Sequence, residues 1–333
     1  MIKTTRYLES HLLNWLLVTL IGLVLTSCGG GNGEVGITPT ADDQALSEKV
    51  VSEFSIGPTW DALKVSSEFL FERNDFLTAR LAANTVKVTT VHRTGTGFYL
   101  GKHLGHHIIA TTAHGLVNVP SCKFSTVLIQ FPMAKKVYTC KELIGIWADV
   151  DYAMLALKAE PEEDEFFATL NPLKLAPLSG NPLQGTPLMS MGFGSVLNND
   201  HQLTLKEDRY CTNLSPQFAR MNNGDERIPR KIPSFAVGCD LSPGDSGSAL
   251  VDKVNGRVVG MVWSIMKPKS PFVKSAAFLE DILSQSEPNV WEDFGYAVPV
   301  SSIRRSLQIW ANRVEVSLPM RKRRRIVLKI LDQ

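Results

Sequence analysis

Several features are missing from this 333-residue sequence, and each absence narrows its interpretation. No Cys-x-x-Cys pair occurs, which ranks disulfides above a zinc site for the few cysteines present. The apolar stretch at residues 12–25 is shorter than the about 20 residues that a membrane-spanning helix needs. There is no internal repeat, and the formal net charge of +2 neither favours nor disfavours a charged partner. The composition, 44% apolar and 20% charged, is ordinary for a globular protein with a sizeable core.

The beginning of the chain predicts export. Lys3 and Arg6 precede the apolar stretch 12–25, which is the order expected in a secretory signal peptide. The following segment, 25–28, has the sequence Leu-Thr-Ser-Cys and resembles the lipobox of bacterial lipoproteins, which implies cleavage before Cys28 and a lipid on its sulfur. The next residue is not the aspartate that retains such lipoproteins in the inner membrane, so in a two-membrane bacterium we expect the outer membrane. The alternative is an ordinary signal peptide beside an incidental cysteine.

Export would place the other cysteines in an oxidising compartment, which favours disulfides. With Cys28 set aside, four cysteines remain, and they allow three connectivities. Pairing of neighbours in the sequence is the simplest connectivity, because each half of the protein would then be cross-linked by its own disulfide. These pairs are Cys122 with Cys140 and Cys211 with Cys239.

Composition divides the chain into five stretches: a signal peptide 1–27, a flexible glycine-rich tether 28–44, a helical prefix or propeptide 45–81, a strand-rich domain 82–314 and a basic tail 315–333. Within the prefix, apolar spacing predicts one helix at 45–54 and another from about Thr59 to Leu77. The tail carries a basic run, 321–325, which we expect to be solvated rather than bound to anionic lipid.

Short apolar or alternating runs, separated by turn residues, predict an all-β fold from residue 85 onward. The expected strands are 86–88, 98–100, 107–110, 127–131, 137–146, 152–157, 188–191, 235–237, 249–251 and 258–265. One strong helix, 301–314, should follow them. His103, His106 and His107 surround Gly105, and we favour a solvated hairpin turn over a metal site there.

The sharpest chemical signal is the sequence Gly-Asp-Ser-Gly at residues 244–247. A serine hydroxyl is a weak nucleophile until a base removes its proton, and the oxyanion that follows needs nearby N–H donors. Gly244 would let the chain turn so that its own N–H and that of Ser246 point at one spot. Gly247 would let the backbone pass close behind the nucleophile. Taken alone, the same string also fits a glycine-rich surface turn.

A base for this serine must lie upstream, because no histidine follows Ser246. That absence excludes the Ser–Asp–His chain order of α/β-hydrolases. His114 comes directly after an apolar run, 108–113, that would fix an imidazole at a strand end. Asp151 precedes a second apolar run and is the preferred carboxylate to orient the imidazole. Asp149 would face the same way on a strand and is the alternative.

Together these motifs resemble the trypsin-like, chymotrypsin-fold serine peptidases, here in a bacterial secreted lipoprotein form. Residues 111–114, Thr-Thr-Ala-His, are similar to the Thr-Ala-Ala-His signature of that family, and the chain order His, Asp, Ser is the same. Residues 95–100 and 296–300 resemble two of its strands, and the resemblance covers about residues 82–314. It implies an all-β fold of two six-stranded antiparallel β-barrels with a C-terminal helix.

The resemblance also implies a serine endopeptidase that works through an acyl-enzyme. His114 would be the base, Asp151 its orienter and Ser246 the nucleophile, and the N–H groups of Gly244 and Ser246 would form the oxyanion hole. No cofactor and no metal are implied. We expect a monomer in the cell envelope with a protein or peptide substrate, a lipid anchor at Cys28 and no nucleic-acid partner. The alternatives are a catalytically silent binding module on the same fold and an esterase.

One departure from the family concerns activation. Animal members become active when a newly cut N-terminus pairs with the aspartate just before the serine. Asp245 stands at that place, but no such N-terminal sequence occurs before Val86. We therefore favour another cationic partner for Asp245 over a cut near Arg80 and Leu81.

A second departure concerns specificity. Asp240 stands where trypsin carries the aspartate of its pocket, and a carboxylate there would favour Lys or Arg before the scissile bond. A structural role beside Cys239 is an equal alternative. Trp263 and Ser264 would lie on the strand that walls the pocket, where relatives usually have Ser-Trp-Gly. No histidine stands on this strand, which disfavours specificity for glutamate.

Overall fold

The computed structural model describes residues 63–116, 119, 122, 127–134, 136–194, 201–207, 211–215, 219–222, 231–265, 295–313 and 318–333. All of them belong to one compact unit, Lys49–Gln333. The predicted signal peptide, Cys28, the tether and the helix expected at 45–54 lie outside the described residues.

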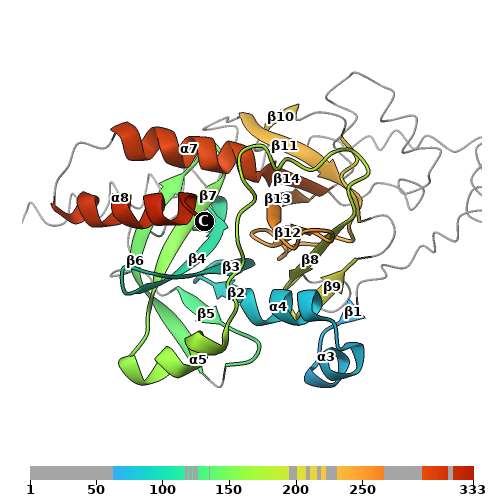
Figure 1. Ribbon diagram of the computed structural model, residues 1–333, viewed down its shortest axis with the longest axis horizontal. Coiled ribbons are helices and arrows are strands. Elements are labelled where there is room, and N and C mark those ends of the chain that lie inside the picture. Colours follow the sequence, from blue (N-terminus) through green and yellow to red (C-terminus); the bar gives the residue numbers. More distant parts are fainter. Residues whose placement is uncertain are drawn as a thin grey trace, which may run out of the picture. The chain divides into compact units, whose positions relative to one another are not determined.

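Six antiparallel strands close into a barrel in the order β2-β3-β4-β7-β6-β5 (Figure 1). Their bounds are β2 (Thr85–Thr89), β3 (Thr94–His103), β4 (His106–Thr112), β5 (Leu128–Gln130), β6 (Val137–Trp147) and β7 (Tyr152–Lys158). Successive side chains of a strand point to opposite faces, so the wholly buried β4 serves two cores. Ile109 packs inside this barrel, whereas Ile108 and Ala110 belong to the core that includes the second sheet.

The second sheet has eight strands in the order β1-β9-β8-β12-β13-β14-β11-β10. Their bounds are β1 (Leu63–Lys64), β8 (Leu188–Gly192), β9 (Thr204–Lys206), β10 (Ala219–Asn222), β11 (Lys231–Val237), β12 (Ala249–Asp252), β13 (Val258–Ile265) and β14 (Gly295–Pro299). All the strands that the sequence predicts are present. The short β1, β9 and β10 were not expected, because two to four residues carry too little apolar pattern to be recognised.

A segment outside the named strands closes the second sheet into a ring. The N–H of Leu188 at the start of β8 donates to the Cys211 carbonyl at 2.7 Å, and the N–H of Leu214 donates to the Ala236 carbonyl of β11 at 2.9 Å. The segment 211–214 therefore joins β8 to β11, and with β12, β13 and β14 it completes a six-membered antiparallel ring. The prediction of two six-stranded barrels is confirmed, with β1 and β10 as additions to the second.

Both disulfides follow the predicted pairing of neighbours. Cys122 is bonded to Cys140 in the first barrel, and Cys211 is bonded to Cys239 in the second. The second bridge ties the ring-closing segment to the residues that follow β11.

The prefix is packed on the domain, but it is not the single helix expected from Thr59 to Leu77. The chain instead forms α3 (Ser67–Arg73) and α4 (Phe76–Asn84). Ser66 and Asp75 cap their N-termini through side-chain oxygens, and these caps fix the boundaries that apolar spacing alone had missed. Helix α4 lies against β3 and β8, so it touches both barrels.

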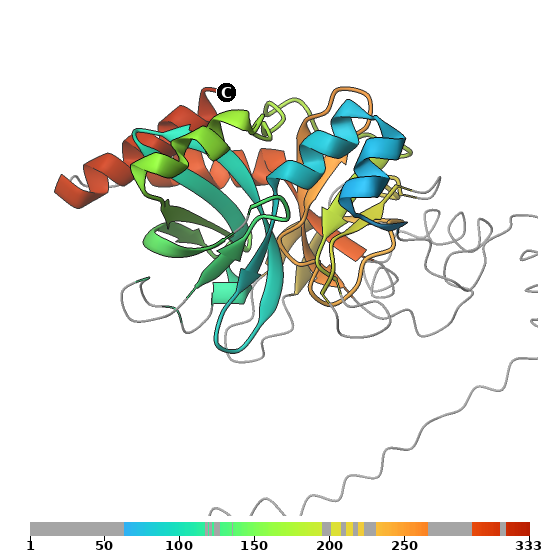
Figure 2. The ribbon, with the colours of Figure 1, turned by 90° about the horizontal axis from the view of Figure 1, so that it is seen from below.

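The C-terminal part consists of two helices, α7 (Val300–Arg313) and α8 (Leu318–Leu331), which lie side by side in both views (Figures 1 and 2). The predicted late helix is thus present. The basic run 321–325 lies within α8 and is largely exposed, as expected, but the tail is docked on the domain, because Ile326, Val327 and Ile330 of the same helix are fully buried in the core. A shorter helix, α5 (Asp164–Thr169), was not expected. In the described part of the chain, no helix is long and apolar enough to cross a membrane.

The histidines around Gly105 form a hairpin turn as predicted, but they are buried rather than solvated. His103, His106 and His107 are each less than 8% exposed, and burial lowers the pKa of all three. The His107 ring stacks on Phe167 of α5, a packing that turn chemistry could not reveal. No metal-ligand cluster is found among the described residues.

Candidate active site

His114 and Asp151 are joined where two strands of the first barrel meet a turn. His114 follows β4, and Asp151 lies in the turn between β6 and β7. Asp151 Oδ2 lies 2.6 Å from His114 Nδ1, and Asp151 Oδ1 accepts the backbone N–H of His114 at 2.8 Å. Because a carboxylate only accepts hydrogen bonds, Nδ1 carries the proton and Nε2 presents its lone pair. The carboxylate is buried, whereas the His114 side chain is 37% exposed and can reach a substrate.

The backbone of Asp151 is itself unusual. Its φ is +45°, a left-handed conformation that non-glycine residues seldom adopt. Its carbonyl accepts the N–H of Ala113 at 2.9 Å, which holds the turn against the strand that carries His114. Strained residues of this kind persist where their surroundings over-determine them. Asp149, the alternative carboxylate, instead accepts the single hydroxyl proton of Ser306 of α7, whose Oγ lies 2.9 Å from Oδ1 and 2.8 Å from Oδ2.

Ser246 lies in the turn between β11 and β12, and two glycines shape this turn. Gly244 has φ +103°, and a Cβ there would lie 2.6 Å from the Phe193 carbonyl oxygen. Gly247 has φ +95°, and a Cβ there would lie 1.9 Å from the Thr96 carbonyl oxygen. Only glycine combines a positive φ with so close a backbone approach. The turn at Gly244 and the close backbone approach at Gly247 are therefore both present, while the convergence of the Gly244 and Ser246 N–H groups stays a prediction.

Thr96 of β3 fastens the serine turn to the barrel that carries His114. Its N–H donates to the Ser246 carbonyl at 2.9 Å, and its Oγ1 donates to the Gly244 carbonyl at 2.8 Å. The Thr96 carbonyl accepts a hydrogen bond from the hydroxyl of Thr111 at 2.8 Å, and Thr111 lies three residues before His114. The serine turn thus lies beside the end of β4. Thr96 was not singled out from sequence, although it is the central residue of the Gly-Thr-Gly segment that carries part of the family resemblance.

The Ser246 hydroxyl donates to the Trp263 carbonyl at 3.5 Å. Among the described residues, no hydrogen bond joins this hydroxyl to His114. The N–H groups of Gly244 and Ser246 also have no acceptor among the residues that the structure describes. Unpaired, preorganised N–H groups beside a nucleophile are what an oxyanion hole requires.

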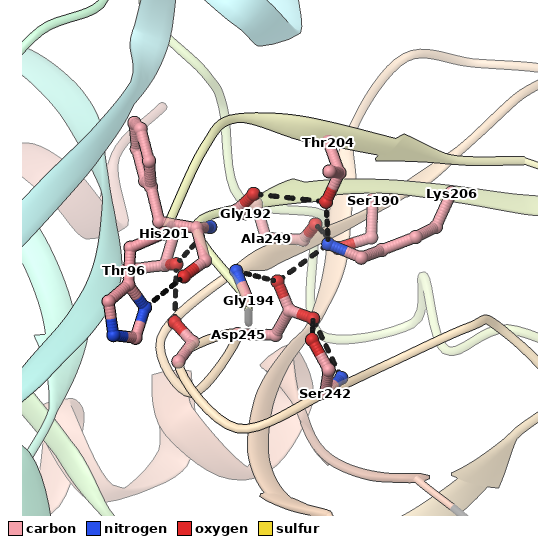
Figure 3. A network of polar contacts seen from close by, with 12 residues as sticks. Thr96, Ser190, Gly192, Gly194, His201, Thr204, Lys206, Ser242, Asp245 and Ala249 are labelled. Carbon is pink, nitrogen blue, oxygen red and sulfur yellow. Dashed lines mark hydrogen bonds and ion pairs between the residues drawn. The ribbon is translucent and has the colours of Figure 1, made fainter. Parts of the chain in front are cut away.

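Asp245 is fully buried and has a cationic partner, Lys206 of β9, at 2.6 Å (Figure 3). The expectation of a cation other than an N-terminus is therefore met within the fold. Sequence reasoning did not find Lys206, because nothing in a three-residue strand distinguishes a buried lysine from an exposed one. The same carboxylate accepts the N–H of Gly194 at 3.1 Å and that of Ser242 at 2.8 Å.

The residues expected in a specificity pocket are buried. Asp240 and Trp263 are 4% and 5% exposed, and Trp263 Nε1 donates to Ser234 Oγ at 2.9 Å. Ser264 lies next along β13 and is half-buried. The pocket role of these residues stays a prediction, since the chain from 266 to 294 lies outside the described residues.

Residues 95–261, half of the chain, match the family model described as trypsin-like peptidase domain. No curated protein matches the sequence significantly. Among solved structures, an inactive-form mutant of Rv3671c from M. tuberculosis H37Rv is 16% identical and covers 78% of this chain and 100% of its own, with a TM-score of 0.49. Deg5 is 19% identical and covers 72% of this chain and 94% of its own, with a TM-score of 0.43.

Proposed function

The chain belongs to the trypsin-like peptidase family, and from that premise we propose that it is a serine endopeptidase whose triad is His114, Asp151 and Ser246. The observation that carries the proposal is the pair of hydrogen bonds that the backbone N–H and the ring Nδ1–H of His114 donate to the Asp151 carboxylate. It fixes both the tautomer and the orientation of the imidazole, which are the two properties a general base needs. A binding module would require neither.

The reaction follows from these positions. His114 Nε2 takes the proton of the Ser246 hydroxyl as Oγ attacks the carbonyl carbon of the scissile peptide bond. The N–H groups of Gly244 and Ser246 bind the oxyanion of the tetrahedral intermediate. The imidazolium then gives its proton to the leaving amine, and the C–N bond breaks to leave an acyl-enzyme. Water, deprotonated by His114, hydrolyses the ester and restores Ser246.

One movement is required before the first step. The Ser246 hydroxyl must leave the Trp263 carbonyl and turn toward His114 Nε2. A hydrogen bond of 3.5 Å is at the long limit and costs little to break. Catalytic hydrogen bonds are commonly long or misaligned without substrate and tighten in the complex.

A fluorophosphonate label tests the proposal. The folded wild-type protein should gain the mass of one phosphonyl group on Ser246, and Ser246→Ala should gain none. Asp151→Asn should label much more slowly, whereas Asp149→Asn, a carboxylate two residues away that bonds to Ser306, should label at the wild-type rate. A correctly folded wild type that is not labelled and cleaves no peptide would leave the binding module as the function.

For specificity, we propose that Asp240 favours Lys or Arg before the scissile bond. A peptide library should show that preference in the wild type and its loss in Asp240→Ser. Cleavage without such a preference would assign Asp240 a structural role beside Cys239.

For location, we propose export and lipid attachment at Cys28. Expression in a bacterium fed a clickable palmitate analogue should label the wild type and leave Cys28→Ala unlabelled. Equal labelling of the two proteins would refute the anchor.

A further inference from the structure

A fully buried lysine and a fully buried aspartate meet directly behind the candidate nucleophile. The ammonium of Lys206 lies 2.6 Å from Asp245 Oδ1, and both side chains are 0% exposed. The ammonium also donates to Thr204 Oγ1 at 2.8 Å. Charges taken out of water are tolerated only when they are paired and further hydrogen-bonded. Each of the two charges therefore fixes the place of the other.

The carboxylate of Asp245 in turn organises the serine turn (Figure 3). Oδ1 accepts the N–H of Gly194, and Oδ2 accepts both the N–H and the hydroxyl of Ser242, at 2.8 and 3.1 Å. The N–H of Asp245 donates to the Ser242 carbonyl at 3.0 Å. Because Ser242 begins the turn and Ser246 ends it, these bonds clamp the stretch that carries the candidate oxyanion donors.

The site around Asp245 has no room for another group. A Cβ on Gly192 would lie 2.3 Å from Oδ1, and a Cβ on Gly194 would lie 2.4 Å from Oδ2. An incoming α-amino group would have to expel the Lys206 ammonium, which would then be buried without its partner. Such an exchange would be costly, since breaking one half of a buried pair strands the other charge.

The cut considered near Arg80 and Leu81 is also disfavoured by the fold. Leu81 is fully buried within α4. The Arg80 guanidinium donates to three backbone carbonyls, those of Asn171, Pro172 and Gly256. A protease needs an extended, accessible segment, and this peptide bond is helical and packed.

We infer that Lys206 is a positioning residue that holds the serine turn, 242–246, in its active conformation, so that the uncut chain is already competent. This inference rests on the proposed function, because competence means exposure of the Gly244 and Ser246 N–H groups to a substrate carbonyl. Lys206 acts only through Asp245 and touches no reacting atom.

The test compares the full chain with two variants and one matched control. Lys206→Met removes the cation, and the double variant Lys206→Met/Asp245→Asn removes both charges and avoids a stranded carboxylate. Lys253→Met removes a surface lysine that is 36% exposed and pairs with Glu207. Intact mass establishes that each protein keeps the prefix 45–81, with no cut beyond the predicted signal-peptide site before Cys28, and thermal melts establish that it is folded.

The uncut wild type should cleave peptides and take the fluorophosphonate label. The folded double variant should lose about 100-fold or more in kcat with KM nearly unchanged, the size of loss seen when an oxyanion donor is misplaced. Amide hydrogen exchange at Gly194 and Ser242 should accelerate in Lys206→Met and in the double variant. If Lys206 only stabilised the fold, exchange would instead accelerate throughout the domain. Lys253→Met should match the wild type in every measurement.

Two results would overturn the inference while leaving the proposed function intact. One is a wild type that becomes active only after its N-terminus is trimmed. The other is a folded double variant with wild-type kcat and unchanged exchange at Gly194 and Ser242. A wild type that is inactive and unlabelled, both uncut and trimmed, would instead refute the proposed function and the inference with it.

Discussion

Asp151 holds His114 at two points, binding the ring Nδ1 with one carboxylate oxygen and the backbone N–H with the other. The first bond sets the tautomer, and the second sets the position of the strand end from which the ring projects. Both bonds come from a residue whose backbone is left-handed, with a φ of +45°.

Asp151→Asn should lower kcat by about 10,000-fold, because an amide can donate to Nδ1 and so favour the wrong tautomer. The stability should change much less, since an amide of the same shape still fills the site. Peptide hydrolysis and urea unfolding would be measured on the same preparations. Asp149→Asn supplies the matched control, because within the described part of the chain its carboxylate bonds to Ser306 and not to His114. Equal kinetic effects of the two substitutions would contradict the assignment of Asp151.

Gly247→Ala should destabilise the protein by about 3 kcal/mol or more, because the new methyl group meets the Thr96 carbonyl oxygen in a backbone with φ +95°. Gly185→Ala separates the cost of the positive φ from the cost of the steric clash. Gly185 also has a positive φ, +78°, but a Cβ there meets nothing within 4 Å. That control should cost only about 1 kcal/mol. Urea denaturation gives both values, and similar losses would show that the close approach to Thr96 is relieved at little cost.

Thr96→Val should weaken the attachment of the serine turn to the first barrel. Valine keeps the shape but removes the hydroxyl that donates to the Gly244 carbonyl and accepts the N–H of Phe193 at 2.9 Å. The buried N–H of Phe193 loses its partner, which should cost about 1–3 kcal/mol, and the partly buried Gly244 carbonyl loses its partner at a smaller cost. We also expect kcat to fall, because Gly244 carries a candidate oxyanion donor. If kcat and stability both match the wild type, Thr96 is not the fastening residue described above.

The buried histidines predict that stability falls in mild acid. Burial lowers the pKa values of His103, His106 and His107 in the folded state. At His106, Lys322 and Lys141 lower the pKa further and Glu142 opposes them. At His107, Asp164 raises the pKa and Lys102 lowers it, but burial has the largest effect. The unfolded chain then binds more protons below the ordinary histidine pKa of about 6.5. Stability should therefore be full above that pH and decline as the pH falls through it.

The check is urea unfolding at pH 7.5 and 5.5. His106→Gln should reduce the difference between the two pH values. His92→Gln, at an exposed turn, is the control and should leave that difference unchanged. The lowered pKa of Asp164, which follows from its bonds to Lys102 and His107, adds a separate loss only at still lower pH. A wild type equally stable at both pH values would contradict the role assigned to the buried rings.

The sequence was most informative where chemistry is local. The glycines around Ser246 predict a tight turn, because a positive φ at a glycine is a local property that the residue type itself indicates. The strands of both barrels followed from short-range patterns for the same reason. Lys206 could not be found this way, since its burial depends on Asp245, which lies far along the chain in the turn between β11 and β12. The docking of α8 could not be predicted for a related reason, because the burial of Ile326, Val327 and Ile330 depends on the core against which they pack and not on the exposed basic run before them.

A crystal structure of the domain with a peptidyl phosphonate bound would test the triad most directly. We expect a covalent bond from the phosphorus to Ser246 Oγ. We also expect His114 Nε2 to lie within about 3.2 Å of that oxygen and the phosphonyl oxygen to accept the N–H groups of Gly244 and Ser246. An imidazole that stays out of reach of the serine oxygen in that complex, or an adduct on another residue, would contradict the triad.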